Sequence, residues 1–134
     1  IAIDVVDELI DRNRNNFKSK NLEFHSMDIV CEDLPKADCV LLKEVLQHLT
    51  NKEIAKILNK INKYKYVIIT ENIPINNFIE NKDKIKGPHS RSYLNSGIIV
   101  HKPPFNFKYF KKQEILKVER PEWNYYLVTT LYIN

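Results

Sequence analysis

The chain has 134 residues, of which 43% are hydrophobic and 28% charged, and its formal net charge is +4. This length allows one domain, the apolar content excludes a disordered tail, and no stretch approaches the ~18 apolar residues of a membrane span. The two cysteines, Cys31 and Cys39, are too few for a disulfide framework, and no signal peptide is present. We therefore expect a cytoplasmic protein. The scattered lysines do not favour a nucleic-acid partner.

The first elements predicted are a strand, a helix and a second strand. Ile1–Val6 is apolar apart from Asp4, which predicts a strand buried on both faces. Asp7 is a plausible N-cap for a helix that runs to about Phe17. Leu22–Ile29 alternates in polarity and predicts another strand with one irregularity.

The strongest local signal predicts a capped amphipathic helix in the middle of the chain. Cys39–Leu42 precedes it and predicts a short, fully buried strand. Thr50 and Glu53 have the spacing of a capping box. The apolar residues that follow recur on one helical face; they are Ile54, Ile57, Leu58 and Ile61.

The rest of the chain predicts one more buried strand, a long loop and a strand pair. Tyr66–Thr70 is the strand, and it ends at Glu71. Residues 75–104 are polar and rich in glycine and proline, and a loop of that length is usually functional. Phe105–Phe110 and Tyr125–Ile133 predict an antiparallel pair at a sheet edge. Buried strands that alternate with amphipathic helices predict an α/β fold with a parallel sheet.

Acidic residues stand where three of the predicted parallel strands end, at Asp4, Asp28 and Glu71, and the pair Lys43–Glu44 follows the fourth. Ligands of open α/β sheets bind at the carboxyl ends of the strands, and an acid there binds the ribose hydroxyls of nucleotide cofactors. The alternative for Asp4 is an acid at a helix N-terminus, a role that it would share with Asp7.

The order and spacing of Asp4, the "MDI" that contains Asp28, and "ADCVLLKEVLQHL" resemble the class I, Rossmann-like S-adenosylmethionine-dependent methyltransferases. The resemblance covers about residues 1–72. It implies that Asp4 binds the ribose of the cofactor, that Val5 next to it also belongs to the cofactor site, and that Asp28 and Ile29 hold the adenine. Lys43 and Glu44 would line the methionine and substrate side.

A weaker resemblance covers "NKDKIKGPHSRSYLNSGIIVHKPPFNF". It is similar to the region that shapes the substrate pocket in a bacterial subgroup, with Gly87, Arg91, Leu94 and Pro104-Phe105 as the matching positions. It implies that Arg91 and Tyr93 clamp a substrate; the alternative is that both are solvated loop residues.

The resemblance implies one partial methyltransferase domain over residues 1–134. Residues 1–74 would form the cofactor-binding half, 75–104 the substrate-side loop and 105–134 the antiparallel pair at the end of a mostly parallel sheet flanked by helices. The family's glycine-rich turn has no counterpart here, since Gly87 and Gly97 lie far downstream. Ile1 matches the start of the family's second strand. We therefore expect an N-terminally truncated domain that binds the cofactor weakly.

The function predicted is methyl transfer from S-adenosylmethionine to a small molecule, a reaction that depends mainly on alignment. His48 is a candidate base, or it packs at a loop. Glu44 is a second catalytic candidate, or it forms an ion pair with Lys43. A nonenzymatic binding module and a basic RNA- or nucleotide-binding domain are the alternatives. We expect no metal site, because the cysteines and histidines lack ligand spacing.

Overall fold

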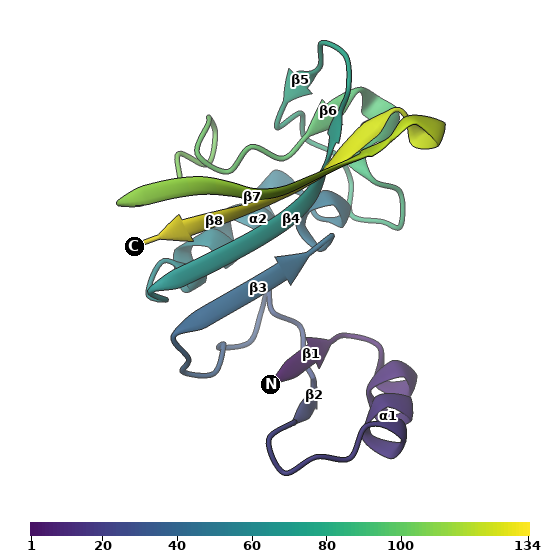
Figure 1. The fold of residues 1–134 in the computed structure, drawn as a ribbon, viewed down its shortest axis with the longest axis vertical. Helices are drawn as coiled ribbons and strands as arrows, with labels where there is room; N and C mark the ends of the chain where they lie inside the picture. The colour runs from purple at the N-terminus through teal and green to yellow at the C-terminus, as the bar shows by residue number, and fades with distance from the viewer. The chain divides into compact units, whose positions relative to one another are not determined.

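The computed structural model describes residues 1–134, which divide into two compact units, Ile1–Leu34 and Pro35–Asn134. In Figure 1 the first unit is purple to dark blue, and the second continues from blue to yellow at the C-terminus. None of the helices has both the length and the apolar character that crossing a membrane requires.

The first unit is a small β-α-β arrangement. Strand β1 (Ala2–Asp4) leads into helix α1 (Asp7–Asn16), and strand β2 (Phe24–Ser26) returns parallel to β1. The register sets Asp4 opposite Ser26, so both strands end at the same edge. The helix buries Ile10.

Three predictions for this unit are corrected. Val5 and Val6 are 64% and 46% exposed, so the prediction of a strand buried on both faces is wrong; β1 has only β2 as a strand neighbour. Asp7 is the first residue of the helix and not its N-cap. The Asp7 carboxylate does not cap the helix; it accepts a hydrogen bond from the Ser26 hydroxyl. Strand β2 is shorter than predicted because the chain turns after residue 28, where Glu32 N–H bonds to the Asp28 carbonyl.

The second unit contains a mixed four-stranded sheet in the order β3-β4-β8-β7. Strands β3 (Cys39–Lys43) and β4 (Tyr66–Pro74) are parallel, whereas β8 (Tyr125–Ile133) and β7 (Lys111–Arg120) join antiparallel. The C-terminal antiparallel pair is confirmed. The prediction of a mostly parallel sheet is wrong, because the long β8 pairs with β4 and β7 and outweighs the single parallel contact of the short β3.

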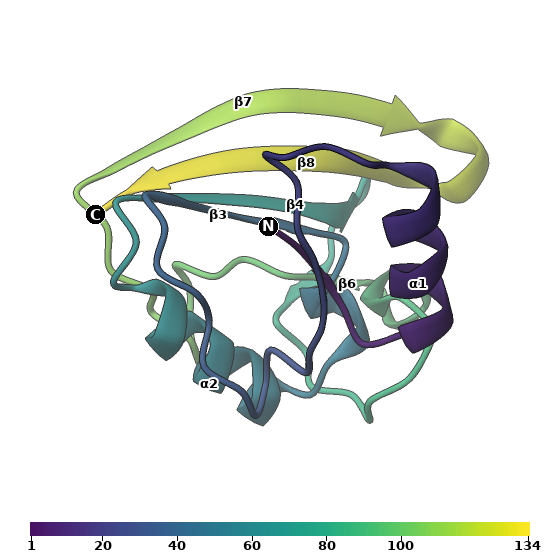
Figure 2. The same ribbon diagram turned by 90° about the horizontal axis from the view of Figure 1, so that it is seen from below.

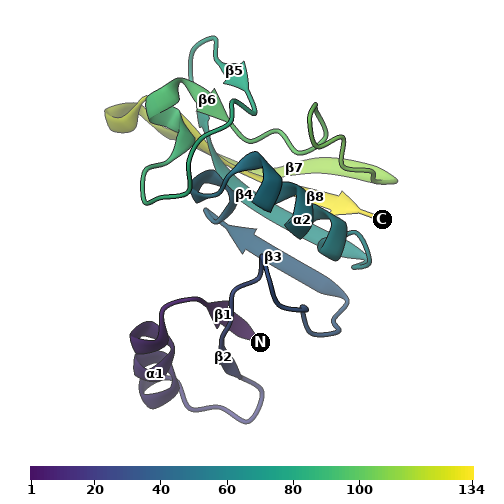
Figure 3. The ribbon, with the colours of Figure 1, turned by 180° about the vertical axis from the view of Figure 1, so that it is seen from behind.

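Helix α2 (Asn51–Ile61) covers one face of this sheet together with the chain between β4 and β7, as Figures 2 and 3 show. Both hydrogen bonds of the predicted capping box between Thr50 and Glu53 are present. The predicted apolar face is also confirmed, since all four of its members are buried: Ile54, Ile57, Leu58 and Ile61.

The two faces of the sheet differ in burial because side chains alternate along each strand. On the face toward α2, Leu42, Val67 and Ile69 are buried. Leu41 is 60% exposed and Cys39 is exposed, and both belong to the opposite face. The prediction that Cys39–Leu42 is fully buried is therefore wrong: β3 is an edge strand whose second face has no helix of this unit over it.

Two other boundaries differ from prediction. Strand β4 continues past Glu71 to Pro74, because β8 stays hydrogen-bonded to it as far as the pair Pro74–Tyr125. The strand before β8 is not Phe105–Phe110, which lies in turns and coil, but the charged segment Lys111–Arg120. Seven of the ten residues of β7 are charged or polar, and its three apolar residues, Ile115, Leu116 and Val118, do not alternate regularly. The register shift between Glu114 and Leu116 accounts for this irregular pattern, and β7 pairs with β8 along its whole length.

The predicted loop 75–104 contains short elements: β5 (Ile79–Glu80), the 3₁₀ turn η2 (Arg91–Leu94) and β6 (Ser96–Gly97). Two further 3₁₀ turns are η1 (Leu46–His48), which precedes α2, and η3 (Pro121–Trp123), which joins β7 to β8. Strands β5 and β6 pair in parallel.

Gly97 allows β6 to lie close to the end of β4, and we predict that alanine there destabilises the fold. An added Cβ would lie 3.0 Å from Ile73 Cδ1 and 3.2 Å from Pro74 Cδ. Overpacking of this kind costs about 1–3 kcal/mol of the free energy of unfolding. At Gly87 the same substitution meets nothing within 4 Å and serves as the control. Urea unfolding of Gly97→Ala and Gly87→Ala with equal midpoints would contradict the prediction.

Candidate functional site

The first group of candidate residues lies at the carboxyl end of the β1-β2 pair. Asp4 ends β1, and its Oδ1 accepts a hydrogen bond from Val6 N–H at 3.0 Å. Asp28 follows β2, and its Oδ1 accepts one from Val30 N–H at 2.8 Å. Both side chains are half-buried. Each acid thus fixes the turn after its strand through its Oδ1 atom.

The neighbours of these acids differ in exposure. Val5 is 64% exposed, and Ile29 is half-buried. The backbone N–H of Asp28 donates to Glu32 Oε1 at 2.8 Å, which holds the turn that carries Ile29. Each of the two acids is thus followed in the chain by an apolar residue that is at least partly exposed.

The second group lies where β3 ends beside Thr70 and Glu71 of β4, in the other unit. Strand β3 ends at Lys43, and Glu44 follows with a left-handed φ of 55°. Glu44 N–H donates to the Thr70 carbonyl of β4 at 2.8 Å, and its carboxylate pairs with Lys43 Nζ at 3.1 Å. A left-handed conformation is strained for a residue with a side chain and is more common at functional positions.

Glu71 holds the 3₁₀ turn that follows Glu44. Its carboxylate is buried and accepts hydrogen bonds from Leu46 N–H at 2.8 Å and Gln47 N–H at 3.2 Å. Burial raises the pKa of Glu71 to about 8, although these two N–H groups oppose the shift. The sequence placed Glu71 at a strand end but gave no signal for this long-range contact. Its role is to position the turn η1.

Buried amides and His48 complete this end of the sheet. Asn72 Nδ2 donates to Gln47 Oε1 at 2.8 Å, and both side chains are buried. Asn72 Oδ1 and His48 Nδ1 are buried without a hydrogen-bond partner. Unpaired buried polar atoms are rare in folded proteins, so these two atoms mark an unusual point in the structure. The Gln47–Asn72 pair has no local sequence signal, because its members are far apart in the chain.

Arg91 is buried and binds backbone carbonyls rather than solvent. Its guanidinium donates to the Leu49 carbonyl at 2.6 Å and to the Lys82 carbonyl. Burial lowers its pKa, and the nearby Asp83 and Glu71 charges oppose that change. Arg91 thus fastens the segment before η2 to the end of η1.

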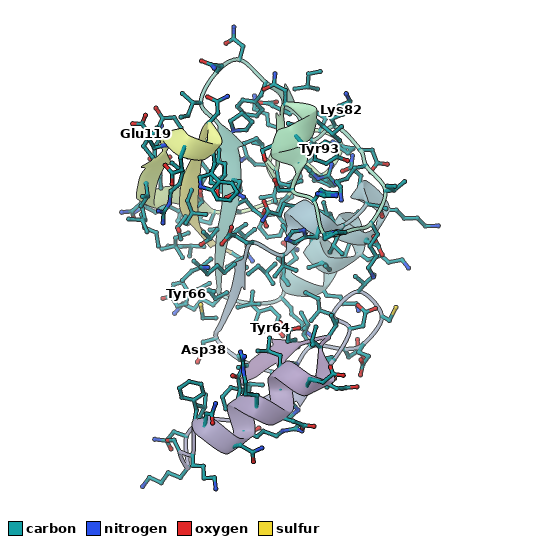
Figure 4. The ribbon with its side chains drawn as sticks, turned by 90° about the vertical axis from the view of Figure 1, so that its right-hand side faces the viewer. Asp38, Tyr64, Tyr66, Lys82, Tyr93 and Glu119 are labelled. Carbon is teal, nitrogen blue, oxygen red and sulfur yellow. The ribbon has the colours of Figure 1, made fainter.

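Tyr93 lies on η2 and is 60% exposed; Figure 4 labels it together with Lys82. Its ring meets the His89 ring edge to face, with centroids 5.8 Å apart. The two residues predicted to clamp a substrate therefore differ in the structure. Arg91 is buried and bonded to backbone carbonyls, whereas the Tyr93 ring is exposed.

The comparisons with known proteins agree with this architecture. The model of the O-methyltransferase domain family matches residues 3–84. A crystal structure from Listeria monocytogenes, assigned as an S-adenosylmethionine dependent methyltransferase, superposes with a TM-score of 0.61 at 13% sequence identity. The match covers 98% of this chain and 78% of the other. None of the curated proteins matches the sequence.

Proposed function

Because the chain belongs to the O-methyltransferase domain family, we propose that it binds S-adenosylmethionine and takes part in methylating a hydroxyl of a small molecule. The observation that carries the proposal is the pair of half-buried acids, Asp4 and Asp28, at one end of two parallel strands. Family membership supports the reaction, and the two acids support the cofactor.

The residues of the first unit fit the cofactor. Each acid has one carboxylate oxygen that its own turn does not use. Asp4 would accept hydrogen bonds from the ribose hydroxyls, and Asp28 would accept one from the adenine amino group, with Val5 and Ile29 against the adenosine. When bound, S-adenosylmethionine supplies an electrophilic methyl group.

The residues of the second unit supply groups for the acceptor. His48 Nδ1 has no hydrogen-bond partner, so it is our candidate for the base that takes the hydroxyl proton. Glu44 is the alternative base, and its carboxylate is held by the ion pair with Lys43 Nζ at 3.1 Å. Lys43 would line the methionine side and Tyr93 the substrate side. Arg91 would act by holding the loop that carries Tyr93.

We predict that Asp4→Asn weakens binding of S-adenosylhomocysteine by about 10- to 100-fold. Hydrogen bonds to a charged group contribute about 1.5–3 kcal/mol each, and the amide loses that charge. Calorimetric titration of the chain measures the dissociation constant. Asp33→Asn makes the same change at an exposed acid of the same unit and serves as the control.

Two outcomes would count against the proposal. Equal affinities for the Asp4 and Asp33 variants would remove the ribose role from Asp4. Absence of binding by the unmodified chain, and by a longer chain that includes it, would contradict cofactor use and favour a nonenzymatic binding module.

A further inference from the structure

A pocket lies between strands β4, β8 and β7 and the chain segment 98–101, within the second unit, and the proposed function does not assign it a role. Its volume is about 180 Å³. A cavity of about 150 Å³ is large enough for a benzene-sized molecule. We call it the β8 pocket, because β8 forms the middle of its floor.

The inner part of the β8 pocket is mostly apolar, with one buried carboxyl group, that of Glu71. Burial raises the pKa of Glu71 to about 8, so this carboxyl is protonated at neutral pH and does not repel an anion there. Val128 of β8 and Ile69 and Ile73 of β4 line it on the sheet side, and Ile98 and Val100 face them from the covering segment. These are branched aliphatic side chains, and an apolar ring among them would be removed from water.

The outer part of the pocket carries charged groups of β7. Lys112, Glu114 and Lys117 line it, and all three are exposed. Lys112 and Lys117 are not among the residues that form salt bridges. The two lysines therefore face the pocket without a carboxylate of the protein at ion-pair distance, and their combined charge exceeds that of Glu114.

Both lysines are positioned by aromatic neighbours. Lys117 Nζ lies 3.9 Å from the centroid of the Tyr126 ring. Lys112 Nζ lies 3.3 Å from His101 Nε2, and His101 Nδ1 lies 3.5 Å from the Tyr132 hydroxyl. Burial and the nearby Lys112 and Lys102 charges lower the pKa of His101, so the ring is neutral and accepts from Lys112. The ammonium groups are thus held by neutral partners and keep their charge for a ligand.

We propose that the β8 pocket binds a small organic anion whose apolar body is about the size of a six-membered ring. The ring would lie against Ile73, Val100 and Val128, and the anionic group would meet Lys112 and Lys117. The Glu114 carboxylate would repel the anionic group, so we expect a ligand with a single negative charge. This proposal does not depend on cofactor binding.

Methyl NMR spectra of the chain, titrated with benzoate, test the proposal. Benzyl alcohol and benzylamine are the neutral and cationic probes of the same size. We expect saturating shifts with benzoate at the methyls of Ile73, Val100 and Val128, and none at Ile54 of α2, which does not line the pocket. Benzoate should bind more tightly than benzyl alcohol, and benzylamine most weakly. Shifts that do not saturate, or equal binding of benzoate and benzylamine, would overturn the proposal.

Variants of β7 separate a specific anion site from general attraction to a basic protein. Lys112→Met and Lys117→Met should each weaken benzoate binding by roughly two- to fivefold, as for a partly exposed ion pair. Glu114→Gln should strengthen it. Lys111 neighbours Lys112 but points to the other face of the sheet. Equal loss in Lys111→Met and Lys112→Met would overturn the site. Since no cofactor is added, the outcome is separate from that of the methyltransferase proposal.

Discussion

Replacing Glu71 by glutamine should remove a fall in stability that we expect between about pH 5 and pH 8. The folded-state pKa of Glu71, about 8, lies above its unfolded value of 4.5. In this range the folded chain therefore holds a proton that the unfolded chain has lost. The free energy of unfolding then decreases as pH rises, by at most about 1.4 kcal/mol per pH unit. The total over the range is several kcal/mol.

Urea unfolding at four pH values between 5 and 8 measures this dependence. The free energy of unfolding of Glu71→Gln should depend less on pH than that of the unmodified protein. The variant should be less stable at low pH, because its amide NH₂ group cannot accept a hydrogen bond and would face one of the two N–H donors of η1. Glu119→Gln changes an exposed acid of β7 and should follow the unmodified protein. Parallel curves for the unmodified protein and Glu71→Gln would show that Glu71 is ionised throughout the range.

Replacing Arg91 by methionine should lower the free energy of unfolding by about 2–4 kcal/mol. The substitution keeps an apolar chain in a fully buried position but leaves the carbonyls of Leu49 and Lys82 without their charged donor. Hydrogen bonds to charged groups contribute about 1.5–3 kcal/mol each. Methionine does not require a charged group to be buried, and this gain offsets part of the loss in the free energy of unfolding.

Two further substitutions separate the role of Arg91 from a general effect of arginine. Arg91→Lys should have an intermediate effect, because an ammonium cannot reach both carbonyls with the geometry of a guanidinium. Arg120→Met, at an exposed position of β7, should change the free energy by no more than about 0.5 kcal/mol. Amide exchange over residues 82–94 should become faster in Arg91→Met. Unchanged exchange there would contradict the fastening role.

Features that depend on residues only a few positions apart were predictable from the sequence. Thr50 and Glu53 are three residues apart, and their capping box depends on little else. The positions of Asp4 and Asp28 near the ends of β1 and β2 were also predictable, because each acid follows an apolar or alternating run. The same local reasoning placed Lys43 and Glu44 at the end of β3.

Features that depend on distant parts of the chain were not predictable. The burial of Leu41 depends on what covers the second face of the sheet, and the sequence of β3 alone does not say. Strand β7 is mostly charged and polar, its few apolar residues do not alternate, and its pairing with β8 includes a register shift that the sequence does not indicate. The contacts of Glu71 with η1 and of Arg91 with Leu49 join residues that are 24 to 42 positions apart. Their burial could not be read from the polar loops around them.

The most direct test of cofactor binding is an amide NMR titration of the ¹⁵N-labelled chain with S-adenosylhomocysteine. We predict saturating shifts at the amides of Val6 and Val30, whose N–H groups bond to the Asp4 and Asp28 carboxylates. The amides of β7 should remain unchanged. Saturating shifts confined to β7 and β8, with none at Val6 or Val30, would contradict the assignment of the cofactor to these two acids.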